Sequence, residues 1–152
     1  MGNGTTEKSP FSKLVQIGII VKDMDETIKR LQSYGIGPFE HRAVPAGAKE
    51  YYKGKPMEAI FKIAAVNLGG VEMEFIQPVQ GDSPHMEFLK EKGEGIQHLA
   101  FAVDNLDEDI ENLKEKGASV QMQSDLGLVK VAYMDMKTSG LVFELMQFMK
   151  TG

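Results

Sequence analysis

The chain has 152 residues, of which 42% are hydrophobic and 26% are charged, proportions typical of a folded globular protein. Its formal net charge of −5 argues against nucleic acid as a partner, because phosphate binding calls for a basic surface. It contains no cysteine, which excludes disulfides, thiolate metal sites and a cysteine nucleophile.

The N-terminal residues 1–13 are polar and rich in glycine at their start, and we predict that they form a disordered tail. Further along, no apolar run approaches the roughly 18 residues that a membrane-spanning helix needs. We therefore expect no membrane partner. The lack of cysteine is typical of a protein from the reducing cytoplasm.

Residues 14–150 contain an internal repeat, and we predict that they form a single domain. The stretch 17–35 (IGIIVKDMDETIKRLQSYG) matches the stretch 99–117 (LAFAVDNLDEDIENLKEKG) at a constant offset. Each copy begins with alternating positions that predict a strand and continues with apolar residues at helical spacing. The repeat therefore predicts two modules of the same architecture.

Both predicted helices have recognisable ends. Asp23 and Asn105 precede them as N-cap residues, each followed three positions later by glutamate. Gly35 and Gly117 stand where a left-handed C-terminal residue is favoured. Because these boundaries coincide in the two copies, we expect the helices to be equivalent.

The repeat resumes at the end of each half. VEMEFIQ (71–77) parallels LVFELMQ (141–147), which predicts a matching last strand in each module. Two further strands are expected in each module, near 39–44 and 57–67 in the first and near 120–123 and 129–136 in the second.

These elements place module one at 14–78 and module two at 95–148. The linker 79–94 carries a short helix that starts at Ser83 and Pro84 and ends at Gly93. The polar stretch 45–56, which contains proline and glycine, is predicted to be a loop. The predicted fold is α+β, with two βαβββ modules that each contribute a curved mixed sheet.

Four polar residues hold matched positions in the two modules. Gln16 and His98 begin the first strands, and Glu74 and Glu144 lie in the last strands. By strand parity they face away from the helices, whereas bulkier neighbours such as Leu99 point toward them. A carboxylate within an apolar strand is costly to desolvate unless it has a partner. Because imidazole, carboxylate and amide oxygen suit Co, Mn, Zn or Ni, these residues predict a divalent metal site.

Other interpretations of these residues stay open. A histidine beside an apolar strand is commonly structural, and a glutamate in a strand is commonly exposed at a sheet edge. The site is also consistent with binding of an anion. We interpret the two remaining histidines, His41 and His85, as residues without a functional role.

Paired βαβββ modules with ligands on their first and last strands resemble the vicinal oxygen chelate superfamily, which includes glyoxalase I, extradiol dioxygenases and bleomycin resistance proteins. Within it, the chain is most similar to the methylmalonyl-CoA epimerases. That similarity lies in VNLGGVEMEFIQPV, GDSPHMEFLKEKGEGIQHLAFAVDNLDE and SGLVFELMQ. The resemblance covers nearly the whole chain and implies a glyoxalase-like fold.

The resemblance also implies roles for particular residues. Gln16, Glu74, His98 and Glu144 correspond to metal ligands, and Glu144 corresponds to a residue that is both ligand and acid/base. A second base is expected from the third strand of module one, where Glu58 is the nearest candidate. The implied enzyme removes a proton next to a thioester through a metal-stabilised enolate, takes an acyl-CoA substrate and forms a homodimer.

Two alternatives remain. Epimerases of this kind have histidine where the chain has Gln16, and the set Gln, Glu, His, Glu resembles that of some glyoxalase I enzymes. A lyase of the lactoylglutathione lyase type, acting on another thioester or hemithioacetal, is therefore one alternative. The other is a protein of the bleomycin resistance type, which binds a ligand without catalysis.

Overall fold

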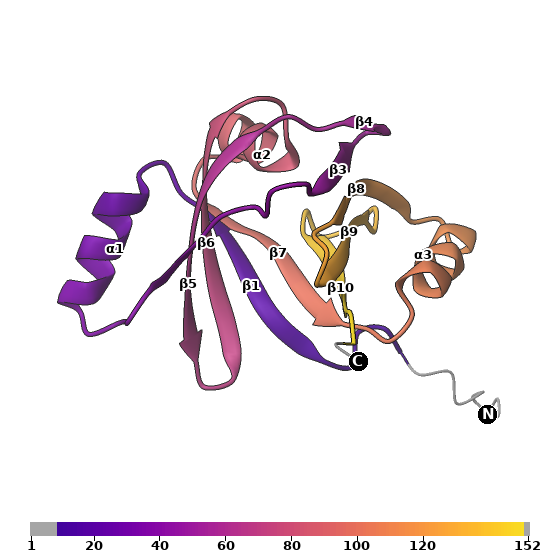
Figure 1. Cartoon of the computed structure of the whole chain (residues 1–152), viewed down its shortest axis with the longest axis horizontal. Coiled ribbons are helices and arrows are strands. Elements are labelled where there is room, and N and C mark those ends of the chain that lie inside the picture. Colours follow the sequence, from indigo (N-terminus) through magenta and orange to yellow (C-terminus); the bar gives the residue numbers. More distant parts are fainter. Residues whose placement is uncertain (1–8, 151–152) are drawn as a thin grey trace.

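The computed structural model describes residues 9–150, arranged as ten strands and three helices (Figure 1). The strands are β1 (Leu14–Ile20), β2 (Glu40–Arg42), β3 (Lys49–Tyr52), β4 (Lys55–Pro56), β5 (Ile60–Leu68), β6 (Val71–Gln80), β7 (Gly95–Ala102), β8 (Ser119–Asp125), β9 (Val129–Asp135) and β10 (Val142–Phe148). The helices are α1 (Met24–Ser33), α2 (Pro84–Lys92) and α3 (Leu106–Glu115).

The strands form one curled mixed sheet in the order β2-β5-β6-β1-β7-β10-β9-β8-β3-β4. In each half the first and last strands of a βαβββ module run parallel, as β1 with β6 and β7 with β10. The halves join where β1 pairs antiparallel with β7 at the centre of the sheet. This confirms the predicted α+β fold of two βαβββ modules, with their two sheets continuous across β1 and β7.

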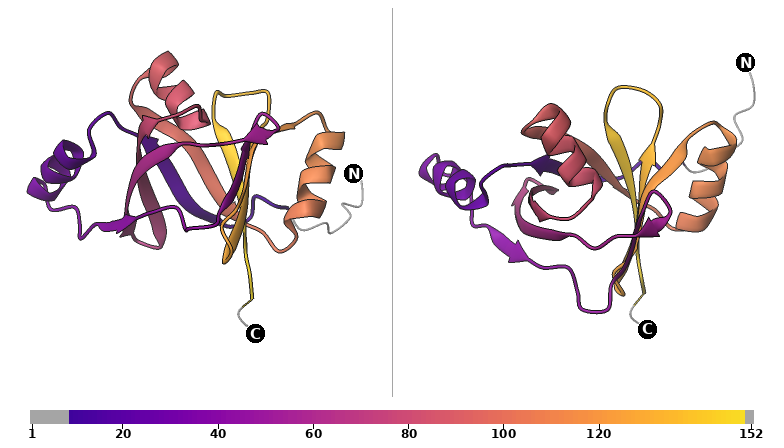
Figure 2. Two further views of the ribbon diagram at one scale, coloured as in Figure 1. Left: turned by 45° about the horizontal axis from the view of Figure 1, so that its top comes forward. Right: turned by 90° about the horizontal axis from the view of Figure 1, so that it is seen from above.

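The helices α1 and α3 lie at opposite ends of the molecule, with the sheet between them (Figures 1 and 2). Both begin at the predicted N-caps, because the Asp23 side chain accepts from the Glu26 amide and the Asn105 side chain accepts from the Glu108 amide. Both are followed by the predicted glycine with positive φ. The helix boundaries are therefore local properties of the sequence.

Two apolar clusters hold the helices against the sheet. Ile28 of α1 packs with Phe75 of β6, and Ile110 of α3 packs with Phe101 of β7. Leu99 packs against the second cluster as well, so the predicted parity of β7 is confirmed on its helix side. The opposite face of the central strands is consequently free to carry polar side chains.

The predicted N-terminal tail falls partly outside the described residues, which begin at residue 9. Within the described part, the Phe11 ring packs edge-on against Phe101, with centroids 5.2 Å apart, and against Phe143 at 5.6 Å. The Lys13 carbonyl accepts a hydrogen bond from the Ala102 amide. Packing against module two therefore begins before β1.

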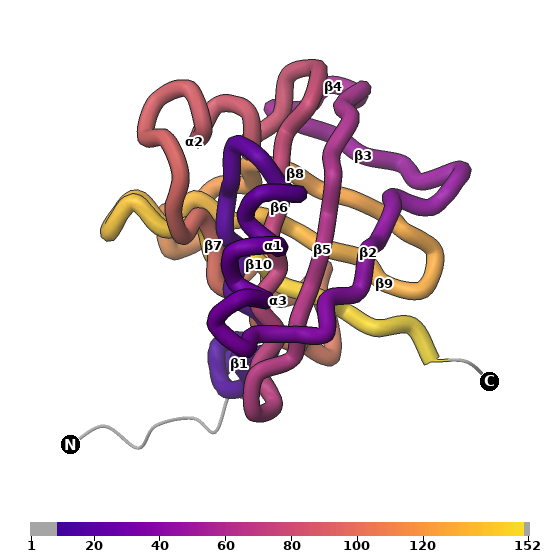
Figure 3. Tube along the Cα trace, turned by 90° about the vertical axis from the view of Figure 1, so that its left-hand side faces the viewer, coloured from indigo at the N-terminus to yellow at the C-terminus, as the bar shows by residue number. Residues whose placement is uncertain are grey.

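The prediction that 45–56 is a loop was wrong, because this stretch contains β3 and β4. Strand β3 leaves module one and pairs antiparallel with β8 of module two (Figures 2 and 3). The pairing aligns Lys49 with Asp125 and Tyr52 with Met122. Because the partner strand lies some 70 residues further along the chain, no local pattern in the stretch reveals it.

Within the described range 9–150, no helix is long and apolar enough to span a bilayer.

Candidate active site

The four predicted site residues come together on the concave side of the sheet, away from α1 and α3. His98 Nε2 lies 3.2 Å from a Glu144 carboxylate oxygen, 3.9 Å from a Glu74 oxygen and 3.4 Å from Gln16 Oε1. His98, Gln16 and Glu144 are buried, and the Glu74 side chain is only 16% exposed. Each module supplies two of the four side chains, as the repeat predicted.

Strand register places these side chains in two neighbouring rows across the sheet. Gly18 of β1 lies between Glu74 of β6 and His98 of β7. In the next row, Gln16 and Glu144 flank Ala100 of β7. The small central residues leave room above the sheet, and a Cβ atom added at Gly18 would overlap the His98 imidazole. The site therefore depends on glycine at position 18 for space.

Two residues that the sequence reasoning missed orient the Gln16 amide. Its Nε2 donates to Glu72 Oε1 at 2.9 Å and to Glu74 Oε2 at 3.2 Å, which turns Oε1 toward His98. Arg42 of β2 holds Glu72 with two hydrogen bonds of 2.6 and 2.7 Å. Glu72 shares a strand face with Glu74, two positions away, and this parity was the only signal in the sequence for it.

Burial dominates the electrostatics of the site. It raises the pKa of Glu74 to about 7, with a further contribution from the Glu72 charge. It also raises the pKa of Glu144 well above the ordinary value, reinforced by the Glu74 charge. The pKa of His98 is lowered to about 3 by burial, so the imidazole is neutral. For Glu72, burial would raise the pKa, but the hydrogen bonds from Arg42 and Gln16 lower it overall.

The donor set fits a divalent cation. It comprises one neutral imidazole, two carboxylates and one amide oxygen, which suit first-row divalent ions. Glu144 Oε2 is buried and has no hydrogen-bond partner, as expected of an oxygen that needs a positive neighbour. Within residues 9–150, no group of three or more His, Asp or Glu side chains is arranged so that it could hold a metal ion without further ligands or movement. Binding would therefore need the Gln16 oxygen or a small shift of a carboxylate.

The same cavity contains a third acidic side chain. Glu50 of β3 lines it together with Gln16, Glu74 and Glu144. Ser124 of β8 donates its hydroxyl to Glu50 Oε2 at 2.9 Å, so the β3–β8 pairing fixes the position of this carboxylate. Sequence reasoning missed Glu50 because it assigned the stretch 45–56 to a loop.

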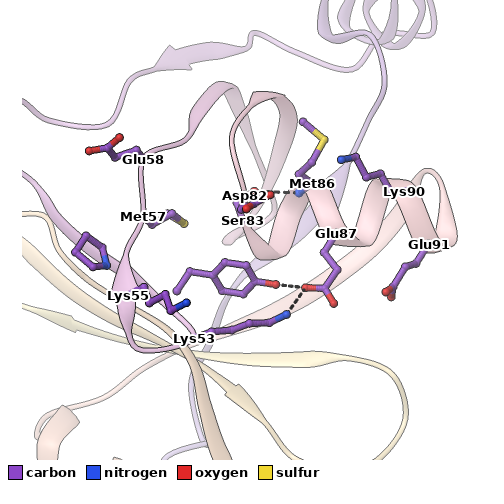
Figure 4. Close-up of a pocket in the computed structure, with 12 residues that line it drawn as sticks. Lys53, Lys55, Met57, Glu58, Asp82, Ser83, Met86, Glu87, Lys90 and Glu91 are labelled. Atoms are coloured by element: carbon purple, nitrogen blue, oxygen red, sulfur yellow. Dashed lines mark hydrogen bonds and ion pairs between the residues drawn. The ribbon is translucent and has the colours of Figure 1, made fainter.

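The structure does not bring Glu58 to the four predicted site residues Gln16, Glu74, His98 and Glu144. Glu58 is exposed and lines a separate pocket between the β3–β4 hairpin and α2, where its carboxylate points away from the helix (Figure 4). In that pocket Glu87 of α2 accepts a hydrogen bond from the Tyr52 hydroxyl, and Lys53 Nζ lies 3.4 Å from the Glu87 carboxylate. These contacts attach the hairpin that carries Glu50 to α2.

His85, which we interpreted as a residue without function, is buried and lines the same cavity as Gln16, Glu50, Glu74 and Glu144. Its Nε2 lies 3.0 Å from the hydroxyl of Tyr133, a buried residue of β9 that also lines the cavity. Burial and the nearby His98 lower the pKa of His85 to about 3. Burial, followed by the charges of Glu144, Glu74 and Glu50, raises the pKa of Tyr133, so its hydroxyl keeps its proton.

Comparison with curated proteins points to epimerases. The chain is 34% identical over 98 residues to the mitochondrial methylmalonyl-CoA epimerase of Bos taurus, a match that covers 55% of this chain and 56% of the relative. It is 40% identical over 55 residues to the Homo sapiens enzyme of that name, covering 36% and 31% of the two chains. The chain thus matches about half or less of each curated relative.

Solved structures share the fold over nearly the whole chain. Methylmalonyl-CoA epimerase from Mycobacterium tuberculosis aligns with a TM-score of 0.71 at 19% identity, covering 97% of this chain and 95% of that one. A Streptomyces coelicolor methylmalonyl-CoA epimerase in complex with 2-nitronate-propionyl-CoA aligns with a TM-score of 0.65 at 21% identity, covering 92% and 99%.

A family match connects these findings to the paired modules and their shared site. Residues 15–139 match the family described as the Glyoxalase/Bleomycin resistance protein/Dioxygenase superfamily. This range contains β6, β7 and all of β1 except its first residue, and therefore Gln16, Glu74 and His98. The chain belongs to the Glyoxalase/Bleomycin resistance protein/Dioxygenase superfamily.

Proposed function

We propose that this protein is a metal-dependent epimerase of a branched acyl-CoA of the methylmalonyl-CoA type. The observation that carries the proposal is the meeting of two carboxylates, Glu50 and Glu144, in the cavity that is also lined by the candidate ligands Gln16 and Glu74. Inversion at a carbon needs one group to remove a proton and another to deliver one to the opposite face. The epimerase relatives and the acyl-CoA complex of a structural neighbour support this choice of substrate.

Gln16, Glu74, His98 and Glu144 are the residues that would hold the metal ion. When bound, a divalent cation supplies Lewis-acid stabilisation of negative charge that develops on a carbonyl oxygen. Neutral His98 offers the Nε2 lone pair, and Gln16 offers Oε1, because its amide nitrogen is engaged by Glu72 and Glu74. The protein thereby orients its donors before any ligand arrives.

The remaining chemistry belongs to the two carboxylates. Ser124 occupies Oε2 of Glu50, which leaves Oε1 to remove the proton next to the thioester carbonyl. Glu144, whose pKa is raised by burial, delivers a proton to the opposite face of the same carbon. One C–H bond breaks and one forms, and in the reverse direction the two residues exchange roles.

The test is epimerisation of methylmalonyl-CoA in D₂O with added Co²⁺ or Mn²⁺, followed by NMR. The wild type should convert one epimer into the other with one deuterium at the inverted carbon. Glu50→Gln should abolish inversion but keep exchange without inversion in the epimer whose proton faces Glu144. If the wild type shows no exchange, the proposed function is wrong.

The matched variant Glu58→Gln decides between the two candidates for the second base. With Glu50 in that role, Glu58→Gln should retain inversion at close to the wild-type rate, because Glu58 lines a different pocket. Loss of inversion in Glu58→Gln but not in Glu50→Gln would restore the role expected from the sequence.

The donor set favours one second candidate, a lyase of the glyoxalase I type. Gln16 stands where epimerases of the family have histidine, and the same four residue types occur in some glyoxalase I enzymes. This alternative predicts formation of a lactoyl thioester from methylglyoxal and glutathione with the metal-loaded protein.

We further propose a homodimer, which is supported by Leu14 and Ile96, apolar residues that are 39% and 52% exposed on the two central strands.

A further inference from the structure

The cavity contains two buried polar side chains that the proposed reaction does not use, His85 of α2 and Tyr133 of β9. They are hydrogen-bonded to each other, with His85 Nε2 3.0 Å from the Tyr133 hydroxyl. The Tyr133 ring packs against the His98 ring at 4.9 Å between centroids. The Phe61 ring packs edge-on against His85 at 4.7 Å. The pair therefore has a fixed position beside the candidate ligands.

The unpartnered atoms of the cavity indicate which residue donates. His85 Nδ1 is buried without a hydrogen-bond partner. If Tyr133 donated to His85, Nδ1 would carry the ring proton as a buried donor without an acceptor. Unpaired buried N–H groups are rarer and more costly than unpaired acceptors. The favoured tautomer carries its proton on Nε2 and donates it to the Tyr133 oxygen.

In this arrangement the hydroxyl proton of Tyr133 is free to donate elsewhere. Tyr133 and Glu144 are direct partners on the neighbouring strands β9 and β10, so their side chains lie side by side on one face. Glu144 Oε2 is also buried without a hydrogen-bond partner. The proton of Tyr133 is thus located where the acyl group of a substrate would meet Glu144.

We propose that Tyr133, oriented by His85, donates a hydrogen bond to a carboxylate oxygen of the acyl group and so selects acyl-CoA substrates that carry a carboxylate beside the thioester. This inference rests on the proposed function, because it assumes an acyl-CoA ligand. In it Tyr133 determines specificity and His85 is a positioning residue. A site with a buried donor rejects ligands that lack the matching acceptor, since the donor would be left unpaired.

Calorimetric titration of two CoA esters tests the proposal. Malonyl-CoA carries the carboxylate and propionyl-CoA lacks it. Tyr133→Phe should weaken binding of malonyl-CoA by about 10- to 100-fold, as expected for a lost hydrogen bond to a charged group, and change binding of propionyl-CoA by about twofold or less. His85→Phe should weaken malonyl-CoA binding by an intermediate factor. Tyr34→Phe, the same change at a residue that is 69% exposed on the surface, should leave both affinities unchanged.

Equal effects of Tyr133→Phe on both esters, or no effect on either, would overturn the inference while leaving epimerisation by the wild type intact. A wild-type protein that binds neither ester would overturn the proposed function together with this assignment. Nitrogen NMR of His85 in the wild type gives a check that needs no variant. The expected spectrum shows a protonated Nε2 and an unprotonated Nδ1, and the opposite tautomer would contradict the direction of donation.

Discussion

Gly18 shows how one residue governs the centre of the site. Among the glycines of residues 9–150 it alone lacks a positive φ, so its role is space rather than backbone conformation. The His98 imidazole occupies the volume that a Cβ atom would fill. A second small residue, Ala100, is fully buried between Gln16 and Glu144 in the adjacent row. Small side chains on the central strands are therefore part of the site although they carry no chemistry.

Gly18→Ala should displace the His98 ring, because the added methyl overlaps it. Overpacking of this kind costs about 1–3 kcal/mol of unfolding free energy, which urea titration would measure, and metal titration should show weaker binding. In a His98→Ala background the overlap no longer exists, so Gly18→Ala should cost much less there. Equal costs in the two backgrounds would contradict the proposed overlap.

At the scale of elements, β3 is the segment that most affects the site. It delivers Glu50 to the cavity and is held there by β8 and by contacts with α2. Tyr52 of β3 donates to Glu87 of α2, and Lys53 Nζ lies 5.1 Å from the Tyr52 ring centroid. The position of the second carboxylate therefore depends on a helix in the linker between the two modules.

Glu87→Ala should loosen the β3–β4 hairpin without unfolding the protein, because the Glu87 side chain is partly exposed and its ion pair with Lys53 lies at the surface. Hydrogen-exchange mass spectrometry should show faster exchange over 49–56. The turnover number should fall, whereas the melting temperature should change little. Glu91→Ala, one turn further along α2 in the same pocket, is the matched control. Unchanged exchange over 49–56 in Glu87→Ala would show that β8 alone holds the hairpin.

Elements also mark the limit of prediction from the sequence. Capping residues and periodicity predicted α1, α2 and α3, because these signals lie within the segments themselves. The repeat identified Gln16 and His98 as equivalents, because it is found by comparing the sequence with itself. The places of Arg42, Glu50 and His85 depend on pairing and packing between segments distant in the chain. Nothing in the residues around Glu50 specifies β8 as its neighbour. The position of Glu50, the proposed second base, can therefore be recognised only in the folded chain.

For the whole molecule, acidity and metal binding are coupled. The pKa of Glu74 is raised to about 7 and that of Glu144 is raised well above the ordinary value, so the metal-free protein keeps protons on these carboxyls to higher pH than ordinary glutamates do. The contribution of Glu74 to stability is present at low pH and is lost as pH rises from the ordinary glutamate range through about 7, and that of Glu144 is lost in the same direction. The lowered pKa values of His85 and His98 have the opposite effect. Their contribution to stability is present above about pH 6.5 and is lost as pH falls toward about 3, because the unfolded chain takes up these protons first.

Binding of a divalent cation should therefore release protons, and binding should tighten as pH rises through 7. Calorimetric titration with Mn²⁺ or Co²⁺ at pH 6.5, in two buffers of different ionisation enthalpy, would count the protons released per ion. Glu144→Gln, which cannot ionise at that position, should release fewer. Binding that neither depends on pH nor releases protons would contradict a role for Glu74 and Glu144 as ligands.

The equal division of the candidate ligands between the modules has a consequence for symmetry. In a pair of identical modules, each first strand would present the same side chain to the shared centre, and so would each last strand. Joining both modules in one chain removes that constraint, and here the first strands differ, with Gln16 facing His98, while the last strands retain Glu74 and Glu144. An amide and an imidazole make the two sides of the cavity chemically unequal, so the two orientations in which a substrate could enter the site are not equivalent.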